Sequence, residues 1–327
     1  PADHAHRAAL PDRGAGIGIH IASLPGAHGI GDIGDAAPQF IDILKAMKIG
    51  AWQFLPTGPT GYGDSPYQPL SALAGNEMLI GLEPLQRQGL LSVEECADLE
   101  HLPATHVDYG GLIPRKQVLL GCVAERFHTR ADSALKTGFD EFLHKHDQAW
   151  LDDYALFRVL KSMHGERPWP EWDTVHARRD RAALAELRKG QSAAIEQVKI
   201  VQFLFNQQWR VLYKHASDVG VSLFGDMPIY IALDSADAWA HPETLLIDRD
   251  GVPSRVAGVP PDYFSADGQL WGNPLYDWEF HADDGYRWWI QRMRHAMNDI
   301  DLVRIDHFRG FESFWSVKYG AETAREG

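Results

Sequence analysis

The sequence is poor in cysteine and has no long run of apolar residues. Its only cysteines, Cys96 and Cys122, are too few for a disulfide framework or a thiolate zinc site, so two reduced, partly buried thiols are expected. No segment approaches the roughly 18 consecutive apolar residues that a membrane helix needs. Residues 1–14 lack the apolar centre of a secretory signal. These absences predict a cytoplasmic protein with no membrane contact.

Positive charge is also scarce. Lys and Arg number 31 against 45 Asp and Glu, which gives a net charge of -14. Binding to a phosphate backbone requires clustered Lys and Arg, so no nucleic-acid partner is expected. Internal repeats are absent as well, which excludes a solenoid. The 45% hydrophobic and 23% charged composition is ordinary for a soluble globular protein.

Aromatic residues are abundant instead. The chain has 11 Trp and 10 Tyr, and several stand beside Asp, Asn and Gly in PPDYFSADGQLWGNPLYDW (260–278). The apolar face of a sugar ring packs on an aromatic ring, while its hydroxyl groups need polar partners, so this composition is typical of carbohydrate sites. A large core also uses Trp and Tyr, and composition alone leaves both interpretations open.

Short apolar segments alternate with amphipathic helical patterns. Between the first two segments, Phe40, Ile41, Leu44 and Met47 recur at helical spacing. Such alternation predicts a parallel sheet, in either a barrel or an open doubly wound sheet. HIASLPGAHGIGDIGD has no P-loop lysine, which disfavours a phosphate-binding open sheet. The four predicted strands lie in GIGIHI (16–21), AWQFLPT (51–57), VGVSLFGDMPIYIA (219–232) and DLVRID (301–306).

Three regions are predicted along the chain. Residues 1–84 hold the first two strands. Residues 85–190 are predicted to form a mainly helical insertion, with a capping box at Ser92 near its start. Residues 191–327 hold the third and fourth strands and a long loop over 255–278.

The stretch VRIDHFRG (303–310) ends an apolar strand with charged residues. Alternate residues of a strand share a face, so Arg304 and Asp306 point the same way, and Asp226 takes the matching place in the third strand. If the branched apolar faces pack on helices, these three side chains point inward at the carboxyl ends of their strands, where (β/α)8 barrels place their chemistry. An aspartate held ionised by arginine suits nucleophilic attack on an anomeric carbon. Spacing alone also allows an ion pair that closes the barrel without chemistry.

Several long motifs stand in the order expected of one enzyme family. They are SLPGAHGIGDIGD (23–35), GYGDSPYQ (61–68), FGDMPIYIALDSADAWAHPE (224–243), GVPPDYFSADGQLWGNPLYDW (258–278) and VRIDHFRGF (303–311). From about residue 14 to the end, the chain resembles the 4-alpha-glucanotransferases, also called amylomaltases or disproportionating enzymes, of glycoside hydrolase family 77. The resemblance implies an α/β fold of the (β/α)8 TIM-barrel type. It also implies a retaining transferase of α-1,4-glucans that acts on maltooligosaccharides, starch or glycogen-type chains without a cofactor.

The resemblance also implies roles for individual residues. Asp306 would be the nucleophile, and Arg304 would position it and keep it charged. Asp226 would bind hydroxyl groups of the donor glucose, with a capping role as the alternative. Tyr67 would stack on a sugar near the cleavage point with Ser65 close by, and packing alone is its alternative.

Further residues are expected on the glucan-contacting loop. Gln269 and Trp271 would overhang the groove and contact the glucan. His307 would either line the site or tie down the loop, and Tyr263 and Asn273 would either contact glucan or serve as loop scaffold. Asp3, His4 and His6 form a His-x-His pattern in a terminal segment, and no metal is expected.

Two motifs of the family are missing. Neither the A-E-D-L-G-like motif of the general acid nor a histidine-aspartate pair occurs, and Glu312, Glu322 and Glu326 are the only glutamates after Asp306. The sequence therefore predicts only the N-terminal half of the barrel, strands 1–4, from a longer enzyme. A retaining site needs two carboxyl groups about 5 Å apart, so this chain is expected to be inactive alone.

Two alternatives to the transferase stay open. One is a non-catalytic glucan-binding or assembly fragment, for which the missing half of the barrel is a conceivable partner. The other is an α-amylase-like hydrolase.

Overall fold

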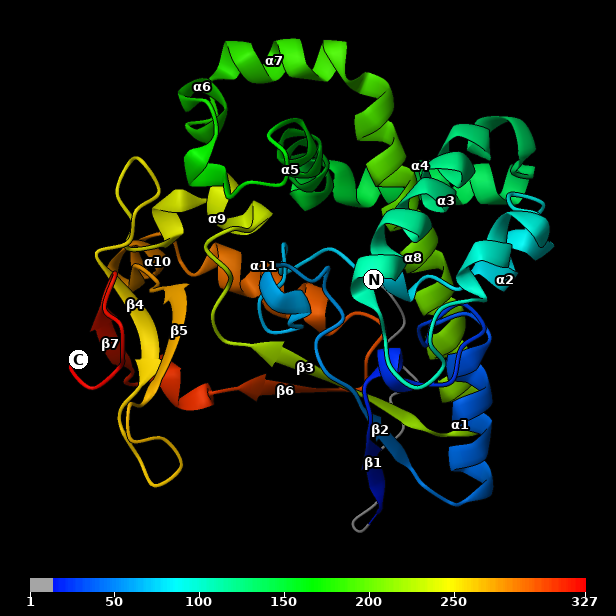
Figure 1. Cartoon of the computed structure of the whole chain (residues 1–327), viewed down its shortest axis with the longest axis horizontal. Helices are drawn as coiled ribbons and strands as arrows, with labels where there is room; N and C mark the ends of the chain where they lie inside the picture. Colours follow the sequence, from blue (N-terminus) through cyan, green and yellow to red (C-terminus); the bar gives the residue numbers. More distant parts are fainter. Residues whose placement is uncertain (1–13) are drawn as a thin grey trace.

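A computed structural model describes residues 14–327 (Figure 1). Residues 1–13, with the Asp3, His4 and His6 pattern, lie outside the described residues. A four-stranded parallel sheet in the order β1-β2-β3-β6 confirms the four predicted strands. The strands are shorter than the apolar segments that predicted them, because the chain turns into irregular structure or 3-10 helix after each one. They are β1 (Gly16–Gly18), β2 (Ala51–Gln53), β3 (Ser222–Pro228) and β6 (Leu302–Asp306).

Helical crossovers join the strands. α1 (Ala36–Ala46) leads to β2, α8 (Ser192–Val219) leads to β3, and α11 (Arg287–Ala296) leads to β6. The apolar stripe of α1 is buried through Ile41 and Leu44, whereas Met47, expected on the same face, is exposed just beyond the helix. These crossovers give the β-α-β connectivity that the periodicity predicted.

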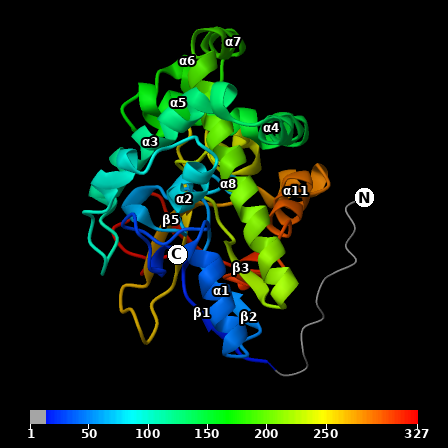
Figure 2. The same cartoon turned by 90° about the vertical axis from the view of Figure 1, so that its right-hand side faces the viewer.

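Helices dominate the segment between β2 and β3, and they gather on one side of the parallel sheet (Figure 2). The predicted capping box is present: Ser92 N donates to Glu95 Oε2 at 2.8 Å, and Glu95 N donates to Ser92 Oγ at 3.4 Å. It begins a 3-10 helix instead of an α-helix. The elements are α2 (Leu82–Arg87), η4 (Glu94–Leu99), α3 (Tyr109–Arg130), α4 (Ser133–His146), the π-helix η5 (Asp147–Leu151), α5 (Asp152–Met163), η6 (Trp169–Glu171), α6 (Thr174–Ala177) and α7 (Arg181–Gly190).

Two buried glutamines of α8 hold the segment that follows β2. Gln202 accepts a hydrogen bond from Gly75 N at 2.8 Å and donates one to Gly75 O at 2.9 Å. Gln208 makes the same pair of bonds with Gly81, at 2.8 and 2.9 Å. Each side-chain amide therefore satisfies both polar groups of one glycine that would otherwise be buried without partners.

The prediction of a loop over 255–278 was wrong in part. β4 (Arg255–Val259), β5 (Gln269–Pro274) and β7 (Trp315–Lys318) form an antiparallel sheet in the order β5-β4-β7. Glycine and proline are frequent in this segment and are typical of loops, but pairing with the distant β7 stabilises the strands. Only the tip, residues 260–268, lies between the two strands without regular structure.

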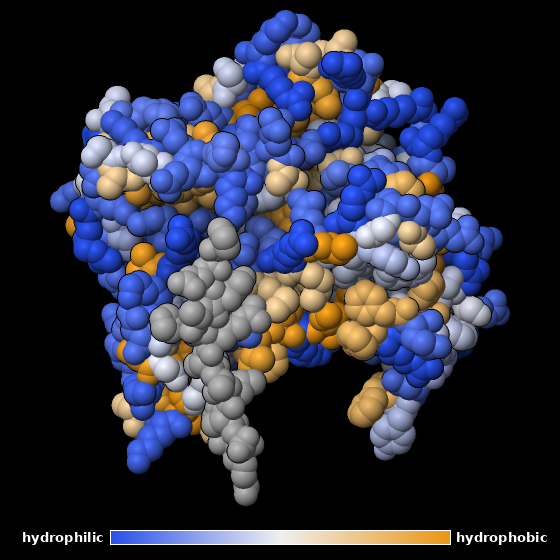
Figure 3. Space-filling model, turned by 180° about the vertical axis from the view of Figure 1, so that it is seen from behind, coloured by the Kyte–Doolittle hydropathy of each residue, from blue (hydrophilic) through white to orange (hydrophobic). Residues whose placement is uncertain are grey.

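The remaining elements are short. They are η1 (Ile21–Ser23), η2 (Tyr62–Asp64), η3 (Glu77–Leu79), α9 (Ala236–Ala240), η7 (Pro242–Thr244), α10 (Trp278–Asp283) and η8 (Phe308–Phe311). Cys96 is buried, Cys122 is half-buried, and both are free thiols, as predicted. None of the helices within 14–327 combines the length and the apolarity needed to cross a membrane. From behind, apolar side chains gather in the lower half of the molecule, at the height of the sheets (Figure 3).

Candidate active site

The carboxyl ends of β3 and β6 lie side by side. In the parallel register Asp226 pairs with Arg304, and Pro228 pairs with Asp306. Because alternate residues share a face, the Asp226, Arg304 and Asp306 side chains meet at this edge of the sheet. Tyr67 reaches the same place from the turn that follows β2.

Arg304 bridges the two aspartates. Its Nη1 donates to Asp226 Oδ2 at 2.7 Å, and its Nη2 donates to Asp306 Oδ1. The Tyr67 hydroxyl donates to the same Asp226 oxygen at 2.7 Å. The structure thus brings together four of the residues singled out from the sequence, in one charge-assisted hydrogen-bond network.

Burial differs sharply within this network. The Asp226 side chain is 1% exposed, whereas Arg304 is 42% and Asp306 is 35% exposed. Asp226 Oδ1 is buried and has no hydrogen-bond partner among the described residues. Asp306 is therefore the carboxylate open to a ligand, while Asp226 offers one buried, unused acceptor oxygen.

The surroundings shift the pKa values of Arg304 and Tyr67. Burial alone would lower the pKa of Arg304, but Asp226 and Asp306 outweigh it, and the pKa is raised. Burial, followed by the hydrogen bond to Asp226, raises the pKa of Tyr67 to about 12. Tyr67 therefore stays a protonated donor at neutral pH.

Aromatic rings form a wall beside the network. The ring of Trp271 on β5 lies 4.9 Å from that of His307, edge to face, and 6.2 Å from that of Tyr230. The Tyr230 hydroxyl and His307 Nε2 are buried without a hydrogen-bond partner in the described part of the chain. Burial lowers the pKa of His307, so the ring is neutral. His307 has a φ of 55°, a left-handed conformation that is uncommon for residues other than glycine.

Tyr230 was not singled out from the sequence. It follows Asp226 and Pro228 at two-residue intervals, so continuing the strand alternation past Pro228 would have placed it on the same face. Burial raises its pKa to about 12. A neutral phenol with an unused hydroxyl group is therefore available beside the carboxylates.

The other predicted residues make bonds within the protein. Ser65 Oγ accepts a hydrogen bond from Tyr67 N at 3.3 Å, and Gln269 Oε1 accepts one from Trp271 Nε1 at 3.1 Å. Asn273 Nδ2 donates to Ile231 O at 2.9 Å. These three side chains orient the aromatic residues and the strand that carries them.

Tyr263 differs from those scaffold residues. It stands at the tip of the β4–β5 hairpin, 97% exposed, with its ring 5.6 Å from that of Phe264. Water therefore surrounds almost the whole side chain.

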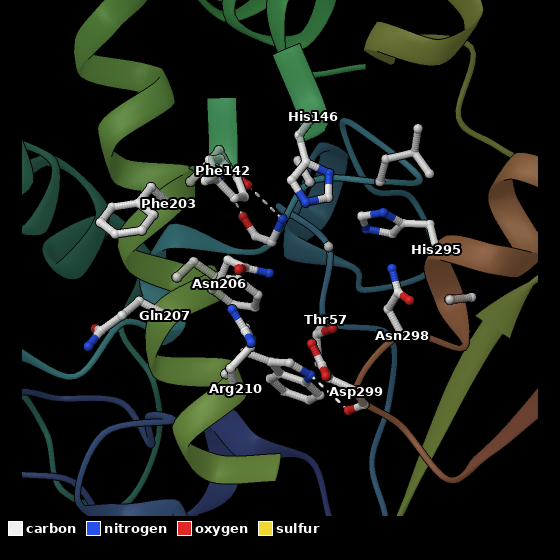
Figure 4. A pocket seen from close by; sticks show the side chains of 18 of the residues that line it. Thr57, Phe142, His146, Phe203, Asn206, Gln207, Arg210, His295, Asn298 and Asp299 are labelled. Carbon is white, nitrogen blue, oxygen red and sulfur yellow. Dashed lines mark hydrogen bonds between the residues drawn. The ribbon is translucent and has the colours of Figure 1, made fainter. Parts of the chain in front are cut away.

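A cavity of about 700 Å³ lies between α8 and α11 (Figure 4). It is also lined by residues along α4, by residues 56–58 and 69–75, and by the end of β3, including Asp226. Polar side chains such as Asn206, Arg210 and Asn298 enter it together with His146 and His295. Asp226 borders this cavity, but Tyr67, Arg304 and Asp306 do not, so the strand ends remain the candidate active site.

Comparison with known proteins gives consistent matches. A family model described as 4-alpha-glucanotransferase matches residues 19–327. The 4-alpha-glucanotransferase of Thermus thermophilus is 43% identical over 315 residues, which cover 96% of this chain and 62% of that protein. A 4-alpha-glucanotransferase of Streptococcus pneumoniae is 43% identical over 323 residues, 97% of this chain and 63% of that protein. The chain thus spans less than two thirds of the length of these relatives.

Solved structures agree with these matches. An amylomaltase from Streptococcus agalactiae in complex with acarbose superposes with a TM-score of 0.92 at 38% identity, over 97% of this chain and 63% of that one. An amylomaltase from Corynebacterium glutamicum, 18% identical, has a TM-score of 0.76 over 95% of this chain and 43% of that one, which shows likeness of fold only. The parallel sheet and its helical crossovers are consistent with a TIM-barrel-type α/β fold.

Proposed function

Because the chain belongs to the 4-alpha-glucanotransferase family, glycoside hydrolase family 77, we propose that it acts in the transfer of α-1,4-glucan segments between maltooligosaccharides. Starch and glycogen-type chains are substrates of the same class. The observation that carries the proposal is the Arg304 bridge between Asp226 and Asp306 at adjoining strand ends. It places an accessible carboxylate, held by an arginine, where barrel enzymes carry out their chemistry.

In the proposed mechanism Asp306 is the nucleophile. One carboxylate oxygen forms a bond to the anomeric carbon of the donor, the bond from that carbon to the glycosidic oxygen breaks, and a carboxylic acid protonates the leaving oxygen. The 4-hydroxyl group of an acceptor glucan then attacks the same carbon, loses its proton to that acid's conjugate base, and releases Asp306. Two displacements retain the configuration. Arg304 places a positive charge beside Asp306 and fixes its direction through a hydrogen bond.

Neighbouring groups would bind the donor glucose. Asp226 Oδ1, the Tyr230 hydroxyl and His307 Nε2 are buried and have no partner within residues 14–327, and sugar hydroxyl groups both donate and accept hydrogen bonds. The Tyr67 hydroxyl is occupied by Asp226, which leaves the ring for stacking. Trp271, oriented by Gln269, offers a second apolar surface.

We further propose that strands β1, β2, β3 and β6 are the first half of a TIM barrel, within the three regions 1–84, 85–190 and 191–327. The carboxylate that Arg304 holds beside Asp306 is Asp226, whose Oδ2 already accepts hydrogen bonds from Arg304 and Tyr67, so it is unsuited to be the acid. The 327-residue chain alone is therefore expected to bind glucan without transferring it.

Incubation with maltotriose tests the function. A longer form that matches the length of the relatives should convert maltotriose into glucose and longer maltooligosaccharides, separated by anion-exchange chromatography. Asp306→Asn should abolish the products, and Asp42→Asn, an exposed aspartate on α1, serves as the control. Maltotriose should quench the tryptophan fluorescence of the 327-residue chain, but no products should form. Reducing ends that grow with time would support a hydrolase, and transfer by the Asp306→Asn form would refute the assignment of the nucleophile.

A further inference from the structure

Two histidines and an aspartate converge between α5 and α6, away from the strand ends. His164 Nε2 and His176 Nδ1 lie 3.2 Å apart. One ligand atom from each of His164, Asp173 and His176 lies within 4.8 Å of the other two. In the span 14–327, no other group of three or more His, Cys, Asp or Glu residues meets this criterion.

The local chain conformation brings the three residues together. Gly165 and Glu166 both have positive φ, 65° and 61°, so the chain reverses directly after His164 at the end of α5. Trp172 then stacks on the His164 ring, with centroids 5.4 Å apart and planes 9° from parallel. This stacking fixes the ring plane and directs Nε2 toward His176.

Asp173 occupies the N-cap position of α6 without acting as a cap. Its side chain accepts no hydrogen bond from the helix backbone, whereas Asp132, Asp180 and Asp277 at other helix starts do. N-cap aspartates ordinarily accept such a bond. The Asp173 carboxylate lies toward the two imidazole rings instead, where it is free to act as a ligand.

The nitrogen separation suits a shared metal ion. Zinc binds imidazole nitrogen at 2.0–2.1 Å, so two nitrogens at a tetrahedral angle lie about 3.3 Å apart. The observed 3.2 Å requires almost no movement. The exposed Asp173 can bring an oxygen to the same distance by side-chain rotation, which leaves a fourth position for water.

The chemistry of the donors narrows the choice of ion. Magnesium and calcium prefer sets made only of oxygen, whereas two imidazole nitrogens and one carboxylate suit zinc and its neighbours in the first transition row. Imidazole binds such an ion in its neutral form.

We propose that His164, Asp173 and His176 form a structural site for a divalent transition-metal ion, with zinc as the first candidate. The sequence had led us to expect no metal. The ion would cross-link the end of α5 to α6. This cross-link would support α9, because the His176 carbonyl accepts a hydrogen bond from Trp239 Nε1 at 3.0 Å. α9 follows β3 and its carboxylate, so the site would stabilise the region next to the strand ends without taking part in catalysis.

Zinc binding to chelator-treated protein tests the proposal. Isothermal titration with zinc chloride should give one more equivalent in the wild type than in His176→Gln or Asp173→Asn. His128→Asn is the matched control, because His128 lies 3.1 Å from Glu196 in a pair that lacks a third ligand. Zinc bound at His4 and His6 would be common to all four proteins and would cancel in the comparison.

Thermal unfolding gives a second readout. At a zinc concentration about 100 times Kd, the midpoint of the wild type and of His128→Asn should rise by about 4 °C, and the two ligand variants should lack this rise. Anomalous diffraction at the zinc edge of wild-type crystals should place a peak between the two imidazole nitrogens, which decides the question even if a variant fails to fold. Equal zinc stoichiometry in wild type and variants, or no peak at this position, would overturn the proposal.

Discussion

Mild acid should destabilise the fold through His146, at the end of α4. The residue is 8% exposed, and Trp150 Nε1 donates a hydrogen bond to its Nδ1 at 3.1 Å. An indole N–H can only donate, so this ring nitrogen must be unprotonated. The ring of His295 on α11 lies 6.4 Å away, facing the same cavity (Figure 4). Burial, followed by the charges of Lys145 and His295, lowers the pKa of His146 to about 4.

The sign and size of the effect follow from proton linkage. The folded-state pKa of about 4 lies below the ordinary value of 6.5, so above pH 6.5 the ring is neutral in both states and the stability is unaffected. As the pH falls below 6.5, the unfolded chain takes up the proton first, and stability is lost down to about pH 4. The loss from this one group is about 2 kcal/mol at pH 5 and on the order of 3 kcal/mol below pH 4.

Urea unfolding at pH 7.5 and pH 5, followed by tryptophan fluorescence, measures the effect. In His146→Asn the amide oxygen replaces Nδ1 as the acceptor for Trp150 but does not titrate. Its free energy of unfolding should therefore fall between the two pH values by about 2 kcal/mol less than that of the wild type. His144→Asn, on the exposed face of the same helix, should follow the wild type, because water surrounds that ring in both states. An identical loss in wild type and His146→Asn would refute the reasoning.

Three further predictions concern the scaffold and the site. Gly31→Ala would place Cβ 2.1 Å from Ile21 O and 2.7 Å from Leu24 O, so we expect a loss of about 3 kcal/mol or more in urea unfolding, whereas Gly50→Ala, with nothing within 4 Å, should be nearly neutral. Gln202→Leu leaves Gly75 N–H and C=O unpaired and should cost about 2–5 kcal/mol, against little change for Gln197→Leu on the same helix, because the half-buried Gln197 makes one solvent-exposed hydrogen bond of 3.4 Å to Glu125. Tyr67→Phe removes one donor to Asp226 and should weaken maltotriose binding about tenfold in fluorescence titrations, with the half-exposed Tyr319→Phe as control; unchanged affinity would contradict the proposed role.

The convergence of Asp226, Arg304 and Asp306 was predictable because successive side chains of a strand point to opposite faces, so every second residue shares a face. The predicted strands and their helical crossovers were recovered for a similar reason: periodicity is a local property. The hydrogen bond from Tyr67 was not predicted, since stacking was the role expected of that residue. The direction of the Tyr67 hydroxyl depends on where β3, which is distant in the sequence, places Asp226, and the sequence alone does not state this.

The antiparallel sheet was missed for the opposite reason. β4 and β5 each contain a glycine, Pro260 follows β4 and Pro274 ends β5; β4 becomes the centre of the sheet because it pairs with β5 on one side and with the remote β7 on the other. The His164, Asp173 and His176 cluster also escaped notice, because the segment that contains it was interpreted only as part of the helical insertion over residues 85–190. Two positive-φ residues and one stacked indole ring create its geometry, and none of these leaves a periodic pattern.

Helix α8 contacts both the helices between β2 and β3 and the parallel sheet with its crossover helix α1. Its 28 residues extend for about 42 Å at 1.5 Å per residue. Along this length it packs on α3, α4, α5 and α7, and also on α1 and β3, as the two views at right angles indicate (Figures 1 and 2). Loss of the helix would expose apolar surface on every one of these neighbours at once. Calorimetry should accordingly register heating as one sharp endotherm, with the covering helices and the parallel strands losing order at the same temperature.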